Sequence, residues 1–124
     1  MELNFICYKK CSTCKKAEKF LRNHGQLFKT RDYVDEPLNE SEITRLYQKS
    51  GLPFEKFLNT SGIPYRELNM KEKRQTLSEQ EIIKLMAEHP KLIKRPILET
   101  ETTATTGFNE TAWTELIAKK KGTA

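Results

Sequence analysis

The sequence predicts a single α/β domain, built from a strand–helix–strand unit, a helical block and a strand–strand–helix unit. The chain has 124 residues, which allows one hydrophobic core and is too short for two ordinary domains. Apolar residues alternate in the first segment, as in a half-buried strand, and recur at helical spacing through the middle. Neither an internal repeat nor a linker interrupts the sequence, so the expected domain spans 1–124.

The first unit consists of a strand, a polar turn, a helix and a second strand. The alternating, β-prone segment Leu3–Tyr8 predicts the first strand, and Lys9–Cys14 forms the turn. One face of the helix is formed by residues at i, i+3, i+4 and i+7, which are Ala17, Phe20, Leu21 and His24. Gly25 ends this helix, and Leu27–Val34 predicts the second strand. Such a unit requires a right-handed parallel crossover.

The middle block, about 37–89, is predicted to be helical because its helix starts carry hydrophobic staples around a polar cap. The caps Asn39 and Ser78 are each completed by a glutamate that makes a capping box, and Asn109 starts the last helix in the same staple. Each cap leads into one apolar stripe; the stripes are Ile43/Leu46/Tyr47, Ile82/Leu85/Met86 and Trp113/Leu116/Ile117.

Two more strands are expected before the last helix. Leu92–Leu98 predicts the third strand, although Pro96 cannot donate a ladder hydrogen bond. We therefore expect Pro96 at the start of this strand, as a cis-proline corner. Thr100–Thr106 predicts the fourth strand, and the helix Trp113–Lys119 covers the resulting pair. The complete sheet is then mixed and four-stranded.

Composition and cysteine usage indicate a reducing compartment. No apolar stretch reaches membrane-spanning length, and the first residues lack the pattern of a signal peptide. All three cysteines lie within the first 14 residues, whereas a disulfide-stapled secreted domain spreads them along the chain. We expect a cytoplasmic protein without membrane contact. The net charge of +5 favours anionic partners, but no basic stripe with interleaved aromatics predicts direct nucleic-acid binding.

The pair Cys11 and Cys14 forms a CxxC motif at a strand-to-helix junction, and this context predicts redox chemistry. A helix N-terminus offers unpaired N–H groups and a partial positive charge, and both stabilise a thiolate. Lysines at positions 9, 10, 15 and 16 add positive potential. We expect Cys11 to be the attacking thiol and Cys14, one helical turn further on, to resolve the mixed disulfide. The alternative is a pair of ordinary buried cysteines.

Metal binding is a weaker alternative, because one CxxC supplies two ligands and structural zinc needs four. His24 is expected to pack at the core edge and His89 to cap a helix. Cys7 extends the motif to the C-x3-C-x2-C spacing of radical-SAM cluster sites, but those enzymes need a much larger barrel. Cys7 is better interpreted as a strand residue packed against the sheet. We expect no metal and no cofactor.

Two segments resemble the arsenate reductase (ArsC)/Spx family, and the resemblance covers nearly the whole chain in order. The segments are Tyr8–Ala17, which reads YKKCSTCKKA, and His89–Ile97, which matches the HPxLIxRPI pattern of that family. Phe57–Gly62 and Gly107–Phe108 also match family landmarks. The second cysteine makes the chain most similar to the CxxC-containing, uncharacterised ArsC-like branch.

This resemblance implies a thioredoxin-like fold whose halves, about 1–34 and 91–120, flank the helical insertion. It implies that Cys11 is the redox nucleophile, that Cys14 is the resolving thiol and that Arg95 lies near the thiolate, ahead of a cis Pro96. A fixed guanidinium can bind an oxyanion and stabilise a thiolate. The implied partners are small thiols or thioredoxin- and glutaredoxin-type reductants, and we expect a monomer.

The chain departs from arsenate reductases of this type, which hold the oxyanion with three arginines. Arg95 matches one of them, whereas Asn59 and Gly107–Phe108 occupy the segments of the other two, and Arg66 does not align. We therefore expect a thiol-dependent oxidoreductase of unknown substrate. The alternative is an Spx-type redox-sensing regulator that binds the RNA polymerase α subunit. Gly51 falls where Spx proteins carry a contact glycine, but a helix-ending glycine is expected there in any case.

Overall fold

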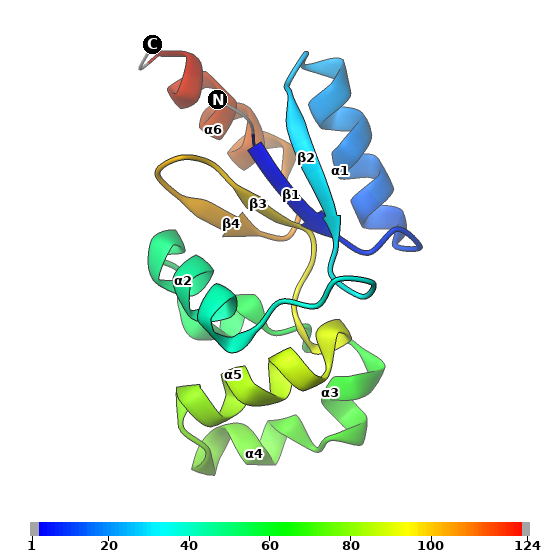
Figure 1. Ribbon diagram of the computed structural model, residues 1–124, viewed down its shortest axis with the longest axis vertical. Coiled ribbons are helices and arrows are strands. Elements are labelled where there is room, and N and C mark those ends of the chain that lie inside the picture. Colours follow the sequence, from blue (N-terminus) through cyan, green and yellow to red (C-terminus); the bar gives the residue numbers. More distant parts are fainter. Residues whose placement is uncertain (1–2, 123–124) are drawn as a thin grey trace.

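The computed structural model describes residues 3–122 and contains one four-stranded sheet with helices on both faces (Figure 1). The elements in chain order are β1 Leu3–Cys7, α1 Ser12–Asn23, β2 Phe28–Asp32, α2 Glu40–Ser50, η1 Phe54–Phe57, α3 Ile63–Glu67, α4 Met70–Thr76, α5 Glu79–Glu88, η2 Pro90–Leu92, β3 Ile97–Glu99, β4 Ala104–Thr106 and α6 Glu110–Gly122. The sheet with α1 and α6 forms one half of the molecule, and α2 to α5 form the other. In the described part of the chain, every helix is too short or too polar to cross a membrane.

The strand order is β2-β1-β3-β4, so β1 from the N-terminal unit pairs with β3 from the C-terminal unit in the middle of the sheet. β1 pairs in parallel with β2, and β3 pairs antiparallel with both β1 and β4. The mixed sheet expected from the strand–helix–strand and strand–strand–helix units is therefore confirmed. Because parallel partners need a crossover, α1 is held against the sheet directly after β1.

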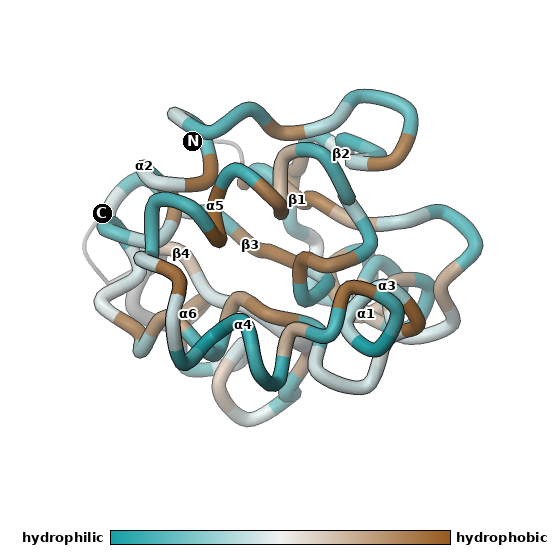
Figure 2. Tube along the Cα trace, turned by 90° about the horizontal axis from the view of Figure 1, so that it is seen from below, coloured by the Kyte–Doolittle hydropathy of each residue, from teal (hydrophilic) through white to brown (hydrophobic). Residues whose placement is uncertain are grey.

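Strand alternation separates the core into two clusters, one on each face of the sheet. Leu3, Phe5 and Cys7 of β1 face α1 and α6, where Cys14, Leu21 and Trp113 pack. Ile6 and Ile97 face the insertion, whose apolar stripes from α2 and α5 pack against them. Figure 2 shows the apolar parts of β1 and β3 near the centre, while α4 is largely hydrophilic.

The predicted caps are confirmed. Asn39 and Ser78 both form complete capping boxes, with Glu42 and Glu81 respectively. The side chain of Asn109 accepts a hydrogen bond from the amide of Ala112 at 2.9 Å. The staple of α6 brings the rings of Phe108 and Trp113 to a centroid distance of 4.9 Å. These local signals correctly place the starts of α2, α5 and α6.

The predicted strands were too long. Leu27 is 75% exposed and lies before β2, because the chain makes a turn after α1, with Gly25 at φ +65°. The third strand was predicted from Leu92, but Leu92 belongs to η2 and β3 begins only at Ile97. The cis Arg95–Pro96 bond places Pro96 at the corner before β3, as expected. The predicted fourth strand loses its first half, because Thr100 and Thr103 close a turn.

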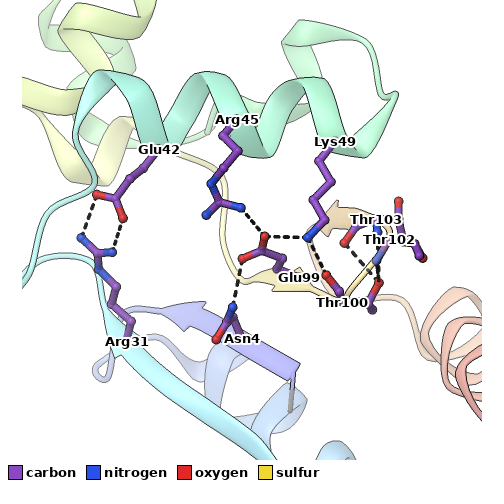
Figure 3. A network of polar contacts seen from close by, with 9 residues as sticks. All are labelled: Asn4, Arg31, Glu42, Arg45, Lys49, Glu99, Thr100, Thr102 and Thr103. Carbon is purple, nitrogen blue, oxygen red and sulfur yellow. Dashed lines mark hydrogen bonds and ion pairs between the residues drawn. The ribbon is translucent and has the colours of Figure 1, made fainter. Parts of the chain in front are cut away.

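A buried carboxylate joins the insertion to the sheet (Figure 3). Glu99 of β3 is only 4% exposed, and it forms ion pairs with Arg45 and, at 2.8 Å, with Lys49. Asn4 of β1 donates a third hydrogen bond to it at 3.1 Å. Burial alone would raise the pKa of Glu99, but these three donors lower it to about 2. The network anchors α2 across β1 and β3.

Candidate redox site

Cys11 is the N-cap residue of α1 and lies half-buried at the end of the turn that follows β1. Its amide donates to the carbonyl of Tyr8 at 2.9 Å, which closes the turn, and its carbonyl accepts from Lys15 at 3.1 Å, which starts the helix. The side chain makes no capping hydrogen bond. The thiol is therefore placed at the positive end of α1 without being used to hold the helix together.

Cys14 lies one turn along α1 and is 2% exposed. The amide of Tyr8 donates to its sulfur at 3.4 Å. The neighbouring thiol of Cys7 raises the pKa of Cys14, and burial raises it further. The interaction of Cys14 with Cys11 acts in the opposite direction. The two cysteines of the motif thus differ as the sequence predicted: one is accessible and the other lies behind it.

Arg95 reaches this site from the segment before β3, immediately ahead of the cis Pro96. Its Nη1 donates to the hydroxyl of Tyr33 at 3.1 Å, and its guanidinium is close enough to Cys11 for the two to interact. Burial would lower the pKa of Arg95, but the interactions with Cys11 and Tyr33 raise it, so the group stays charged. Its Nε is buried and has no hydrogen-bond partner among the described residues.

Tyr33 and Tyr8 hold this arginine in place. Burial raises the pKa of Tyr33 to about 12, so its hydroxyl stays neutral and donates to the carbonyl of Ile93 at 3.4 Å. The Arg95 guanidinium lies 5.7 Å from the ring centroid of Tyr8, and the ammonium of Lys91 lies 4.8 Å from it. Such cation–ring contacts contribute on the order of 0.5–1 kcal/mol each at exposed sites.

A groove of about 550 Å³ opens beside the motif. Its lining residues all belong to the described part of the chain and are Thr13, Leu52, Lys56, Lys94, Arg95, Thr105, Thr106, Gly107, Phe108, Asn109 and Ala112. They include three cations and no carboxylate. Neither cysteine is among these lining residues, but Thr13, which stands between the two cysteines in sequence, and Arg95 are, so the groove lies beside the thiol pair.

Comparison with known proteins identifies the family. The family model described as the ArsC family matches residues 7–116. The chain belongs to the ArsC family. The protein YusI of Bacillus subtilis, named as uncharacterized, is 44% identical over 115 residues, covering 93% of this chain and 98% of YusI. The global transcriptional regulator Spx of Enterococcus faecalis is 33% identical over 100 residues, covering 81% of this chain and 74% of that protein.

Among solved structures, the crystal structure of an ArsC family related protein from Bacteroides fragilis superimposes with a TM-score of 0.88 at 40% identity. The superposition covers 94% of this chain and 98% of the Bacteroides fragilis chain. The thioredoxin-like α/β class expected from the resemblance is thereby confirmed.

At two positions the family resemblance predicts an oxyanion-binding arginine, but this chain has Asn59 and Gly107–Phe108, and these residues have other roles. The side-chain amide of Asn59 donates to the carbonyl of Lys91 at 3.4 Å and lies against Gly62, so it braces the loop around η2. Gly107 has φ +74°, which favours glycine, and the side chain of Lys94 lies over it. Phe108 packs on Trp113. Of the three expected oxyanion-binding positions, only Arg95 carries a cation.

The two histidines both lie at helix ends. His24 is exposed at the end of α1, where its ring stacks on Phe20 at a centroid distance of 4.1 Å. It therefore packs at the edge of the core through one face only. His89 lies between α5 and η2 as a cap. Within residues 3–122, no group of three or more His, Cys, Asp or Glu side chains is arranged to hold a metal ion.

Sequence reasoning missed Tyr33, Lys91 and Lys94 as parts of the site. Tyr33 was interpreted only as a strand residue, yet its buried hydroxyl is the contact that orients Arg95. Lys91 and Lys94 stand in the same short segment as Arg95. Three cations within the five residues before a proline corner are a signal that could have drawn attention to them.

Proposed function

We propose that this ArsC-family protein is a thiol-disulfide oxidoreductase of the reducing cytoplasm. In this proposal, Cys11 is the nucleophile, Cys14 the resolving thiol and Arg95 the group that stabilises the Cys11 thiolate. The observation that carries it is the contact between the Arg95 guanidinium and Cys11, the half-buried thiol at the start of α1. Among the described residues Arg95 forms no ion pair with a carboxylate, so its charge is available to the thiol, and cations beside a cysteine favour the thiolate.

The reaction follows from the placement of the three groups. The Cys11 thiolate attacks one sulfur of a substrate disulfide, and the other sulfur leaves as a thiolate. Cys14 then loses its proton and attacks the Cys11 sulfur, which forms the Cys11–Cys14 disulfide and releases the second substrate thiol. A small-thiol or thioredoxin-type reductant returns both cysteines to thiols. The cationic groove favours substrates and reductants that carry carboxylates or phosphates.

Arsenate reduction should be weak or absent. Each charge-assisted hydrogen bond contributes roughly 1.5–3 kcal/mol, so the absence of two arginines weakens oxyanion binding by orders of magnitude. An assay coupled to glutaredoxin or thioredoxin tests this expectation. Turnover equal to that of a three-arginine ArsC enzyme would contradict it.

A second candidate function is an Spx-type regulator that binds the RNA polymerase α subunit. Two observations favour it: the identity of 33% to the Enterococcus faecalis regulator, and the exposed Gly51, which ends α2 in the left-handed conformation at φ +68°. The helix end alone explains this glycine, so it adds little support. The reductase accounts for more of the site, including the groove beside the cysteines.

The deciding experiment traps mixed disulfides on Cys11. The variant Cys14→Ser is incubated in cell lysate, captured and eluted with dithiothreitol, and Cys11→Ser/Cys14→Ser is the matched control. Small-thiol adducts or client proteins that depend on Cys11 support the oxidoreductase. Recovery of RNA polymerase by both variants, with no adduct on Cys11, would overturn it in favour of the regulator.

A further inference from the structure

We propose that Cys7 is a third redox-active thiol, which attacks the Cys14 sulfur of the Cys11–Cys14 disulfide, moves that bond into the core and sets Cys11 free. This inference rests on the proposed function, because it needs the Cys11–Cys14 disulfide as its starting point. It assigns a chemical role to a cysteine that the reductase mechanism does not use.

The geometry places Cys7 and Cys14 against each other. Cys7 is the last residue of β1 and faces α1, as do Leu3 and Phe5 on the same side of the strand. Cys14 lies in the first turn of α1 and points back toward β1, because its sulfur accepts a hydrogen bond at 3.4 Å from the amide of Tyr8, the residue that follows Cys7. The two thiols belong to the same core cluster and influence each other: their interaction lowers the pKa of Cys7 and raises that of Cys14.

The three thiols form a connected series. The thiol of Cys14 interacts with Cys7 in the core and with the half-buried Cys11. A disulfide requires two cysteines on adjacent segments with Cβ atoms roughly 3.5–4.5 Å apart. The end of β1 and the first turn of α1 are joined by a turn of four residues, Tyr8–Cys11, and Cys7 and Cys14 pack in the same core cluster.

The exchange needs no further oxidant. Cys7 loses its proton, which reaches solvent when the buried thiol is exposed by local opening, and its sulfur forms a bond to the sulfur of Cys14. The Cys11–Cys14 bond breaks, and its electron pair leaves on Cys11 as a thiolate. One disulfide is present before and after the step. The leaving thiolate is the one that contacts Arg95, and a stabilised leaving group accelerates exchange.

The product differs from the first disulfide in access. Cys7 is 3% exposed and Cys14 is 2% exposed, so the new bond is buried among apolar side chains, whereas Cys11 is again an accessible thiol. The oxidised protein could then attack a second disulfide before it is reduced. Large reductants would reach the buried bond only after local opening of α1.

Peptide mapping separates the two disulfides, because the trypsin sites lie between the cysteines. Cleavage after Lys9, Lys10 and Lys15 yields peptide 1–9 with Cys7 and peptide 11–15 with Cys11 and Cys14. The full chain is oxidised with oxidised glutathione, quenched in acid from seconds to hours, and alkylated with N-ethylmaleimide in denaturant. Cys7→Ser is treated in parallel as the control.

The first product should be peptide 11–15 with an internal disulfide and with Cys7 alkylated. In the wild type, a cross-linked pair of peptides 1–9 and 11–15 with alkylated Cys11 should then replace it, while Cys7→Ser keeps the internal disulfide. If the internal disulfide forms in both proteins and persists in the wild type with Cys7 alkylated, the exchange is refuted and the proposed function stands. If it forms in neither, both proposals fail.

Discussion

Arg95 and Glu99 lie four residues apart on either side of the start of β3, and they are used in opposite ways. Glu99 is buried and its carboxylate accepts hydrogen bonds from Asn4, Arg45 and Lys49. Arg95 donates to one tyrosine and leaves its Nε without a partner while it faces a thiol. A charge with all its partners in place holds elements together, whereas a charge with unused donors beside a nucleophile is available for chemistry.

The largest effect should come from breaking the Glu99 network. Glu99→Ala leaves Arg45 and Lys49 without their shared carboxylate and removes a link between α2 and β3. We expect the free energy of unfolding to fall by about 3 kcal/mol, which is the lower end for breaking a buried pair, because Arg45 can turn into solvent.

Urea unfolding at pH 7 measures this loss, and Glu101→Ala at a neighbouring exposed glutamate is the matched control. A loss for Glu99→Ala no larger than that of the control would show that the network contributes nothing to stability. Glu99 would then no longer serve as the example of a charge that holds elements of the fold together.

The same carboxylate should make stability depend on acid. The pKa of Glu99 is about 2 in the folded protein and near 4.5 in the unfolded chain, so its contribution is complete above pH 4.5 and is lost as pH falls toward 2. In the interval, the unfolded chain binds more protons, and stability falls by roughly 2 kcal/mol between pH 5 and pH 3. Urea unfolding of Glu99→Gln over this range should show a correspondingly smaller slope; an unchanged slope would assign the acid effect to Asp32 and Glu42, whose pKa values are also lowered.

Arg95→Ala should affect reactivity rather than folding. Loss of the guanidinium beside Cys11 should slow alkylation of Cys11 by iodoacetamide at pH 7 by about tenfold, equivalent to 1.4 kcal/mol. The free energy of unfolding should change by less than about 1 kcal/mol. Arg95→Lys should restore part of the rate, because it returns the charge without the planar donor geometry.

The exposed Arg66 on α3 provides the control for this prediction, since Arg66→Ala removes the same charge elsewhere. Equal rates for Arg95→Ala and the wild type would mean that Arg95 only braces Tyr33. Arg95, like Glu99, would then serve the structure and not the chemistry of Cys11.

The smallest effect should come from the rim of the groove. Lys94 is exposed and lies over Gly107, so Lys94→Glu changes the charge of the groove without disturbing the core. We expect the rate of reaction with oxidised glutathione to fall by about threefold at low salt and the difference to shrink as salt is added. Lys84→Glu on α5 makes the same charge change away from the site, and an equal decrease there would remove any specific role for Lys94.

The sequence alone determined the order of the strands and the starts of α2, α5 and α6, but it did not reveal the short helices α3 and α4 between them. Capping boxes and staples at Asn39, Ser78 and Asn109 are local signals, because each is complete within about five residues. The CxxC at a strand–helix junction likewise predicted one accessible and one buried thiol, which the exposure of Cys11 and Cys14 bears out.

Only the tertiary structure decided which distant groups meet. The hydrogen bond between Tyr33 and Arg95 spans 62 positions, and the ion pair between Lys49 and Glu99 spans 50. Periodicity reports which face of an element is apolar, but not which polar side chain on another element completes a contact. Strand ends depended on the same information: β3 starts where pairing with β1 begins, at Ile97, and the apolar Leu92 and Ile93 before it pack against the insertion instead.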